Sequence, residues 1–276
     1  MRIIPLVENT SAVPQCQPVH GLSLWIETAH HRLLMDAGPD GRILTVNASA
    51  LQIDLSQAEM LVLSHGHYDH ADGIAAFAAI NPAAPIYLRR TADLPFFSGS
   101  AADGTLHEIG IAHDVLALPQ LCFVDGTTEI GEGLSLFGDI TGRTYWPQSN
   151  LHLSRKDDGI LCQDSFDHEQ CLVIRENGQT VLLSGCAHNG ILNILSRFRE
   201  LYGGSPDVVI SGFHMKKSSP YIPEEEETIR ATACQLQQWP CLFYTCHCTG
   251  ETAFAMMKDI MGDQLRYAAC GTVISL

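Results

Sequence analysis

Three histidines and two aspartates lie within ten positions, 63–72, where the chain reads LSHGHYDHAD directly after an apolar stretch. His65 and His67 are separated by a single glycine, so in an extended segment both imidazole rings point the same way. Asp69 and His70 follow in a tight turn and can face a second ion nearby. Imidazole and carboxylate ligands suit zinc, iron or manganese, and such ions generate hydroxide from water near neutral pH. The motif predicts a site for one or two metal ions, with a solvated histidine-rich turn as the alternative.

Three later segments follow the same order as this motif: an apolar strand, a short turn that carries a histidine, and a helix soon after. VLLSG precedes His188, DVVIS precedes His214, and CLFYT precedes His247. In open α/β architectures the carboxyl ends of strands form a shared rim, where functional sites assemble. We therefore expect these three histidines to surround one pocket together with the residues of the first motif.

The elements that must position these turns follow from the apolar patterning. Early strands are expected at RIIPLVEN, GLSLWIET, HRLLMDAG and AEMLVLS, with a turn at Thr28–His31, and a later hairpin turns at Asn177–Gly178. Helices are expected at GRILTVNASALQI, NGILNILSRF, from EEEETIR onward, and at TGETAFAMMKDI, the last capped by Thr249. In the middle, PIYL, LCFVD and LSLFGDI read as short strands and TGRTYWPQSNLHLSRKDDG as a loop. We expect one domain over residues 1–276 with a variable middle segment at about 81–165.

Composition and charge exclude several classes of function. The 276 residues carry a formal charge of −15, which repels a polynucleotide backbone, so we expect no nucleic-acid partner. No apolar run approaches the roughly 20 residues that span a bilayer, and the N-terminus lacks the apolar core of a signal peptide. The ten cysteines lie mostly within apolar stretches and form no paired CxxC modules, which indicates a reducing compartment. We therefore expect a cytoplasmic protein with no membrane partner.

The HxHxDH pattern after a buried strand resembles the metallo-β-lactamase-fold superfamily of hydrolases. Similarity to one branch, the 7,8-dihydropterin-6-yl-methyl-4-(β-D-ribofuranosyl)aminobenzene 5'-phosphate synthase-like proteins, extends over nearly the whole chain outside the middle segment. The similar stretches are HGLSLWIE, LLMDAGP, LSHGHYDH, HEQCLVI, LSGCAHNGILNIL, SGFHM and CHCTG. The resemblance implies an α/β protein built as an αββα sandwich, with two mixed β-sheets face to face, helices outside, and metals at one edge between the sheets.

The resemblance also implies which side chains hold the metals. We expect the ligands to be His65, His67, Asp69, His70, His188 and His247. Many members carry a bridging aspartate in a Gly-Asp pair, but this chain has LSGCAH there, which puts Cys186 at the bridging position. A thiolate ligand and a packing cysteine both remain open for Cys186, and one fewer anionic bridge would hold a second metal less firmly. Cys246 and Cys248 flank His247, but alternation along an extended segment points both away from it, so we expect them to pack.

Further polar residues on the expected rim are candidates for contact with substrate or metal. His168 and Glu169 open the hairpin where another superfamily histidine would lie, and either a metal or substrate contact or a surface turn fits them. We expect His214 to bind an anionic substrate group as a catalytic residue, and His20 is a weaker candidate of the same kind. Asp36, in LLMDAGP, is expected to orient a ligand histidine.

The function that these residues favour is a metal-dependent hydrolase. It would act on an ester, a phosphoester or a pterin-like phosphorylated small molecule through metal-activated water, with Asp69 as both ligand and acceptor of the water's proton. We expect one or two divalent ions, zinc ahead of manganese or iron, and an anionic small-molecule substrate. A non-haem iron oxidoreductase on the same fold and a non-catalytic, metal-held ligand-binding module are the alternatives. A homo-oligomer fits this size, although no interface is evident in the sequence.

Overall fold

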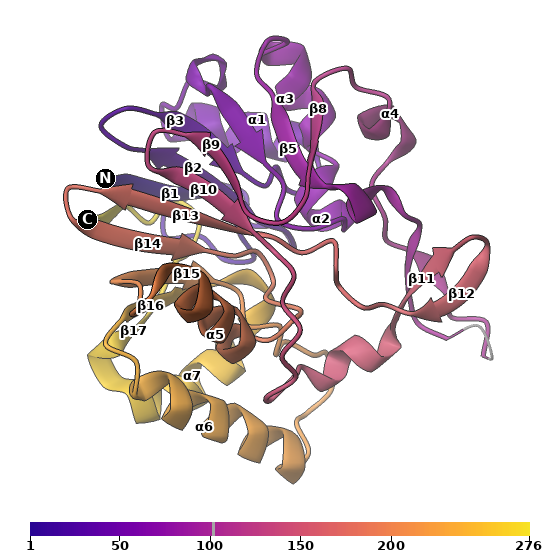
Figure 1. Ribbon diagram of the computed structural model, residues 1–276, viewed down its shortest axis with the longest axis vertical. Helices are drawn as coiled ribbons and strands as arrows, with labels where there is room; N and C mark the ends of the chain where they lie inside the picture. Colours follow the sequence, from indigo (N-terminus) through magenta and orange to yellow (C-terminus); the bar gives the residue numbers. More distant parts are fainter. Residues whose placement is uncertain (101–102) are drawn as a thin grey trace.

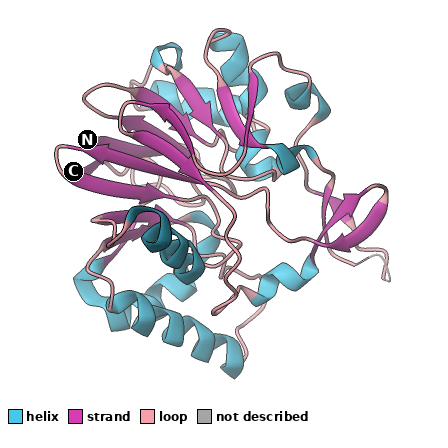
Figure 2. Cartoon of the chain, viewed as in Figure 1, coloured by secondary structure: helices cyan, strands magenta, loops and turns pink. Residues whose placement is uncertain are grey.

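Two seven-stranded β-sheets face each other at the centre of the computed structural model, which describes residues 1–100 and 103–276 (Figure 1). Apolar side chains of both sheets are buried between them. They include Leu24, Leu33 and Val62 from the first sheet and Leu172, Leu183 and Ile210 from the second. Helices cover the outer faces of both sheets, as the cyan elements of Figure 2 show. The αββα sandwich predicted from the sequence is confirmed.

The first sheet has the strand order β18-β1-β2-β3-β4-β5-β8. Its strands are β1 (Arg2–Val7), β2 (Ser23–Glu27), β3 (Arg32–Met35), β4 (Met60–Val62), β5 (Ile86–Arg89), β8 (Leu121–Val124) and β18 (Ile274–Ser275). β2 and β3 pair antiparallel around the turn expected at 28–31. The strands β3, β4, β5 and β8 are parallel, so β4 places the HxHxDH motif at the edge where its carboxyl end lies.

The second sheet has the strand order β17-β16-β15-β14-β13-β10-β9. Its strands are β9 (Thr128–Gly131), β10 (Leu134–Phe137), β13 (Cys171–Glu176), β14 (Gln179–Leu183), β15 (Val208–Ser211), β16 (Leu242–Thr245) and β17 (Leu265–Tyr267). β13 and β14 form the hairpin predicted at residues 177–178. The strands β14, β15, β16 and β17 are parallel, so the turns that carry His188, His214 and His247 leave the same edge of this sheet.

The four predicted helices begin near the expected positions, with one difference in capping. The helices of the structure are α1 (Gly41–Ala50), α2 (Tyr68–Ala71), α3 (Ile74–Ile80), α4 (His113–Leu116), α5 (Ile191–Tyr202), α6 (Pro223–Gln237) and α7 (Glu251–Met261), with 3₁₀ turns η1 (Leu55–Gln57), η2 (Arg90–Asp93), η3 (Gln148–His152), η4 (His247–Thr249) and η5 (Gly262–Gln264). The prediction that Thr249 caps the last helix is wrong. Gly250 is the N-cap, and the Thr249 hydroxyl instead accepts the Phe213 backbone N–H at 2.8 Å. Among the described residues, no helix has both the length and the apolar character that crossing a membrane requires.

A third, four-stranded sheet lies to one side of the sandwich and was not predicted (Figure 1). Its strands, in the order β12-β11-β6-β7, are β6 (Phe96–Ser98), β7 (His107–Glu108), β11 (Leu153–Asp157) and β12 (Ile160–Gln163). The segment expected to be a loop therefore contains the turn η3 and the strand β11. β11 is mostly polar and reaches its two neighbours through backbone pairing, so the sequence showed little of the apolar alternation that marks a strand.

Candidate metal centre

One group of histidines lies at the meeting point of the two sheets. The ligand atoms of His65, His67 and His188 lie within 4.8 Å of one another. All three rings are buried, and the Nε2 atom of each has no hydrogen-bond partner. A buried nitrogen without a partner costs free energy, so three converging on one point indicate a position for a cation. This group is called the first cluster below.

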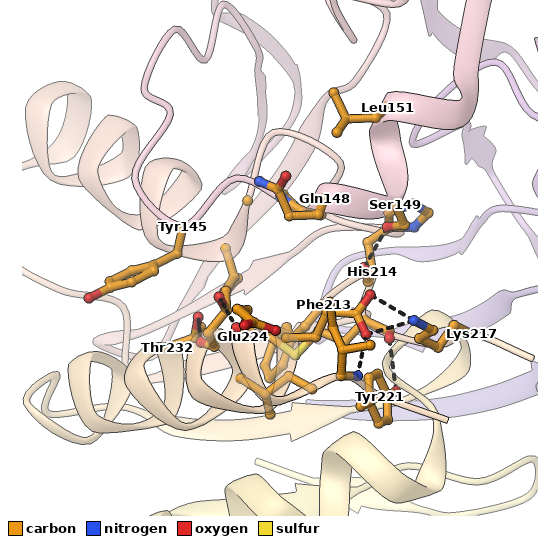
Figure 3. Close-up of a pocket in the computed structure, with 18 of the residues that line it drawn as sticks. Tyr145, Gln148, Ser149, Leu151, Phe213, His214, Lys217, Tyr221, Glu224 and Thr232 are labelled. Atoms are coloured by element: carbon orange, nitrogen blue, oxygen red, sulfur yellow. Dashed lines mark hydrogen bonds and ion pairs between the residues drawn. The ribbon is translucent and has the colours of Figure 1, made fainter. Parts of the chain in front are cut away.

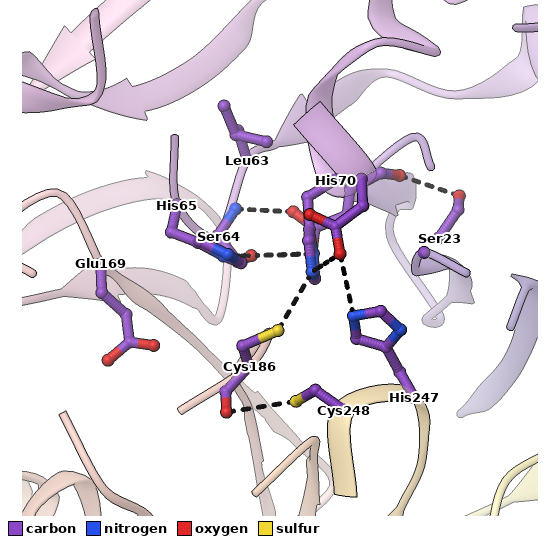
Figure 4. A network of polar contacts seen from close by, with 12 residues as sticks. Ser23, Leu63, Ser64, His65, His70, Glu169, Cys186, His247 and Cys248 are labelled. Atoms are coloured by element: carbon purple, nitrogen blue, oxygen red, sulfur yellow. Dashed lines mark hydrogen bonds and ion pairs between the residues drawn. The ribbon is translucent and has the colours of Figure 1, made fainter. Parts of the chain in front are cut away.

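A second group, called the second cluster, combines a carboxylate with histidines and one thiol (Figure 4). Asp69 Oδ2 lies 3.3 Å from His247 Nε2, and Cys186 Sγ lies 3.2 Å from His70 Nε2. His20 also approaches Asp69 Oδ2 at 3.3 Å, but its side chain is 49% exposed. The structure thus places the residues of the first motif and the later turns around one centre. His20 lies at its solvent side.

Asp36 fixes the protonation of two histidines in this centre. Its carboxylate accepts the Ser64 hydroxyl at 2.7 Å, the Ser64 backbone N–H at 2.7 Å and His70 Nδ1–H at 2.6 Å. Because the Ser64 hydroxyl proton points to Asp36, Ser64 Oγ must accept from His65 Nδ1 at 2.9 Å. In a neutral ring, a proton on Nδ1 leaves Nε2 as a lone-pair donor. Asp36 therefore aims the Nε2 lone pairs of His65 and His70 at the two clusters.

Two asparagines do the same for His188 and His247. Asn150 donates through Nδ2 to the carbonyl of His188 at 2.7 Å, which fixes its amide so that Oδ1 accepts from the ring Nδ1 at 3.0 Å. Asn9 binds His247 in the same way, with 3.0 Å to the carbonyl and 2.9 Å to Nδ1. With its proton on Nδ1, the His247 ring turns the lone pair of Nε2 toward the Asp69 carboxylate, so neither atom can donate a hydrogen bond to the other. That arrangement fits a cation shared between them.

Removing either asparagine is expected to weaken metal binding at one cluster. Asn150→Ala should lower affinity about 10- to 100-fold at the first cluster and Asn9→Ala by a similar factor at the second, because hydrogen bonds behind a ligand contribute to that extent. Zinc titration of metal-free protein against a chromophoric chelator would resolve the two steps. Asn81→Ala is the matched control, since Asn81 also donates to a backbone carbonyl, that of Ala58 at 2.6 Å, outside the centre. Equal affinities in all three variants would contradict this assignment.

Burial and neighbouring charges separate the protonation of the histidines before any ion binds. Burial lowers the pKa of His67 to about 3. Burial also acts to lower the pKa of His70, but the carboxylates of Asp36 and Asp69 outweigh it and raise that pKa to about 9. The metal-free protein therefore holds a proton on His70 that a bound cation must displace.

The stabilisation that the charged His70 gives the metal-free protein is expected to be lost as pH rises from about 6.5 toward 9. In this window the folded state keeps the proton on His70 while the unfolded chain loses it, so this contribution to the free energy of unfolding declines by up to about 1.4 kcal/mol per pH unit. Urea unfolding with a chelator present, measured from about pH 6.5 to about pH 8, stays below the range in which free thiols ionise. The contribution of His70 is the difference between wild type and His70→Gln, because the other buried histidines, whose pKa values are lowered, titrate on unfolding in both proteins. A difference that does not decline with pH would contradict the prediction.

His168 and Glu169 are engaged by the protein rather than turned toward the centre. His168 Nδ1 accepts the Gly66 backbone N–H at 2.9 Å, and its Nε2 donates to Asp164 at 3.1 Å, so both ring nitrogens are occupied. Glu169 accepts the backbone N–H of His188 at 2.7 Å and that of Asn189 at 2.9 Å. Neither alternative, a metal or substrate contact or a surface turn, fits this geometry, because both side chains are buried and hold the backbone of two ligand segments.

Cys248 lies differently from the sequence-based expectation. Alternation would turn it away from His247, but residues 247–249 form the 3₁₀ turn η4 and His247 has φ 48°. This turn brings the ligand atoms of Cys186, His247 and Cys248 within 4.8 Å of one another. Cys246 packs in the core between the sheets, as expected. The sequence signal for Cys248 was its place beside His247, and the alternation of an extended segment, which argued against it, does not apply to such a turn.

A cavity of about 770 Å³ opens beside the first cluster (Figure 3). His214 belongs to its lining, and its ring lies 4.0 Å, centroid to centroid, from that of His188. The other walls include Tyr145, Phe213, Met215 and Tyr221. The buried Nδ1 of His214 has no hydrogen-bond partner. His214 thus lies between the candidate metal centre and a space that can hold a small molecule.

Comparison with known proteins agrees with this geometry. Residues 16–147 match the model of the Metallo-beta-lactamase superfamily. A 7,8-dihydropterin-6-methyl-4-(beta-D-ribofuranosyl)-aminobenzene-5'-phosphate synthase of Methanocaldococcus jannaschii is 24% identical over 273 residues, which cover 92% of this chain and 89% of that protein. Tm1679, a metal-dependent hydrolase of the beta-lactamase superfamily, has a crystal structure similar to this one, with TM-score 0.83 and 29% identity over 100% of this chain and 99% of that one. Zn(2+)-bound PqqB from Methylobacterium extorquens shares the fold, with TM-score 0.60 and 14% identity over 100% of both chains.

The fold and the candidate centre define a protein of the metallo-β-lactamase fold. That fold implies divalent metal binding and supports hydrolase-like chemistry in general. Residues 16–147 carry the match to the metallo-beta-lactamase superfamily domain, and the resemblance indicated by the motifs of the chain is confirmed.

Proposed function

We propose that the protein is a metal-dependent hydrolase that cleaves an ester or phosphoester bond in a small molecule. The observation that carries the proposal is the presence of unpartnered, buried Nε2 atoms from four histidines in two adjoining clusters, three in the first cluster and one beside Asp69 in the second. These atoms belong to His65, His67, His188 and His247. A purely structural zinc site needs only four closed ligands, so two adjoining clusters favour catalysis over a metal-held binding module. His65, His67 and His188 would hold one ion, and Asp69, His70 and His247 a second.

Bound metal ions and two of the chain's own residues, Asp69 and His214, can support hydrolysis. Bound ions would supply a hydroxide near neutral pH and neutralise negative charge that develops on the substrate. Asp69 Oδ2 lies between the rings of His20 and His247, where its carboxylate can take the proton released from the attacking water. His214 belongs to the lining of the cavity, so its imidazole can donate to an anionic oxygen of the substrate.

The cavity bears on the class of substrate. Its apolar walls suit the non-reacting part of the molecule, while the reacting anionic group would lie beside His214. Lys217 in the wall is already paired with Glu225 at 2.6 Å, so it offers little free positive charge for a distant phosphate. The name of the archaeal relative makes a pterin-like phosphorylated molecule one candidate substrate. The formal charge of −15 argues against a polynucleotide substrate, and we further propose zinc as the metal and the cytoplasm as the location.

Removal and return of metal tests the proposed function. The protein would be stripped with a chelator, reloaded separately with zinc, manganese or iron, and assayed on p-nitrophenyl acetate, p-nitrophenyl phosphate and bis(p-nitrophenyl) phosphate. We expect no turnover without metal and recovery with zinc on at least one substrate. Hydrolysis that is unchanged by chelation would overturn the proposal. Visible absorption that dithionite bleaches, together with no hydrolysis for any metal, would replace it with the iron oxidoreductase alternative.

A further inference from the structure

The sulfur atom of Cys186 lies close to histidines of both clusters. Its Sγ lies 3.2 Å from His70 Nε2. The same sulfur lies within 4.8 Å of ligand atoms from His65, from His188 and from His247. A thiolate at this point can contact a cation in either cluster. This is the place that a bridging ligand must occupy.

Cys248 adds a second sulfur on the same side. Two contacts with the backbone hold this sulfur in place. The His214 N–H donates to Cys248 Sγ at 3.3 Å. Cys248 Sγ lies 3.4 Å from the Cys186 carbonyl oxygen (Figure 4). Gly212 leaves room for the sulfur, since a Cβ at that position would lie 2.4 Å from it. Both cysteine side chains are buried, Cys186 at 3% and Cys248 at 5% exposure.

Packing in an apolar cluster explains three other buried cysteines of the chain but not Cys186 and Cys248. The buried Cys16 and Cys270 also lie outside these clusters, but no histidine groups with them among the candidate metal ligands of the described residues. Cys171 and Cys241 belong to the apolar cluster under the helices of the second sheet, and Cys246 belongs to the core between the sheets. Cys186 and Cys248 are in none of the apolar clusters formed by the described residues. Their near neighbours include His70 and His247 instead. The two sulfurs therefore lie among polar side chains, close to histidine nitrogens that have no hydrogen-bond partner.

We propose that Cys186 and Cys248 are sulfur ligands of the second metal position, with Cys186 in place of a bridging carboxylate. The inference rests on the proposed metal-dependent hydrolase and deepens it by specifying the ligands of that centre. Each thiol would release its proton to solvent on binding, as metal ligation by cysteine requires. Two soft thiolates favour zinc, cobalt(II) or ferrous iron over manganese and magnesium, which prefer oxygen ligands. The centre would thus be selective for its metal before any substrate binds.

Cobalt(II) substitution tests the proposal without measuring activity. Cobalt bound to a thiolate shows a near-ultraviolet sulfur-to-metal charge-transfer band, which nitrogen and oxygen ligands alone do not produce. The anaerobic full-length protein, loaded with two equivalents of cobalt(II), should show this band. Cys186→Ser, which removes the sulfur shared by both ions, should remove most of it and Cys248→Ser a smaller part, whereas Cys246→Ser and Cys171→Ser, buried controls, should leave it unchanged. A band that is absent, or that persists undiminished in both Cys186→Ser and Cys248→Ser, would overturn the proposal.

A second measurement needs no variant, in case a serine at either position impairs folding. X-ray absorption at the zinc edge of the unaltered protein should show sulfur scattering at about 2.3 Å, the usual zinc–thiolate distance. A first shell of nitrogen and oxygen alone would overturn the proposal. Neither measurement needs a substrate, so sulfur ligation without hydrolysis would reject only the proposed function. Hydrolysis by a centre without sulfur would reject only the present inference.

Discussion

Replacing His65 with alanine is expected to reduce hydrolysis by roughly 10³-fold and to remove about one metal ion per chain. His65 Nε2 is buried, has no protein partner and shares the first cluster with His67 and His188. Loss of a metal withdraws several kcal/mol of transition-state stabilisation, and each 1.36 kcal/mol corresponds to a tenfold change in rate. Elemental analysis of the purified variant and its turnover on the best p-nitrophenyl substrate would be measured together.

The control for this experiment is His113→Ala. His113 is the first residue of α4 and is exposed, far from the clusters in the sequence and outside them in the fold. It should keep wild-type metal content and turnover. The free energy of unfolding of metal-free His65→Ala should fall by only about 1–2 kcal/mol, because Ser64 Oγ loses one donor while its bond to Asp36 remains. Wild-type turnover in the His65 variant would exclude the first cluster as the reaction centre.

Replacing Asp36 with alanine is expected to give the largest loss of stability, about 3–5 kcal/mol. The carboxylate is fully buried and pairs with His70 while accepting two bonds from Ser64, and removal of one partner of a buried pair leaves the other uncompensated. Asp36 also has φ 62°, a left-handed conformation that alanine adopts less readily than asparagine or aspartate. Urea unfolding of the metal-free variant measures the loss.

Asp36→Asn separates two roles of Asp36, the negative charge beside His70 and the left-handed backbone conformation. Asparagine tolerates the left-handed backbone, but its amide donates where the carboxylate accepts, which disturbs the His70 tautomer. It should therefore retain more stability than Asp36→Ala while binding zinc about 10- to 100-fold more weakly than wild type. Asp40→Ala is the matched control, since Asp40 caps α1 by accepting the Arg42 N–H at 2.6 Å, and its loss should cost about 1 kcal/mol without affecting zinc affinity. Similar zinc affinity in the Asp36→Asn and Asp40→Ala variants would contradict the role given to Asp36.

The sequence predicted the sandwich and the strand ends because both depend on local patterns. The strand before His65 and those before His188 and His247 are short apolar runs that end in turns, and parallel pairing places their ends at one edge. The third sheet escaped prediction because polar, partly exposed strands such as β11 lack the apolar alternation that reveals a buried strand. Propensity carries little information where backbone pairing alone defines the element.

The details of the centre were harder to predict because they depend on contacts between distant segments. Asn9 and His247 are 238 residues apart, and neither Asn9 nor Asn150 lies in a motif. His168 was a reasonable ligand candidate from its place before the hairpin, but only the fold shows its bonds to Gly66 and Asp164. Spacing along a chain identifies groups that can bind a metal. It does not show which of their nitrogens already has a protein partner.

The contacts of Asn9 also order the events of biosynthesis. Asn9 and Glu8 bind the ring, the carbonyl and the backbone N–H of His247. These hydrogen bonds of the segment after β1 can form only once the segment after β16 has been synthesised. Closing so long a loop carries an entropic penalty and places this contact late in folding. Every side chain of the first cluster has been synthesised by residue 188, whereas a nascent chain on the ribosome lacks His247 until 59 further residues have been translated. The second cluster is therefore completed after the first, and a chain truncated before β16 could not acquire it.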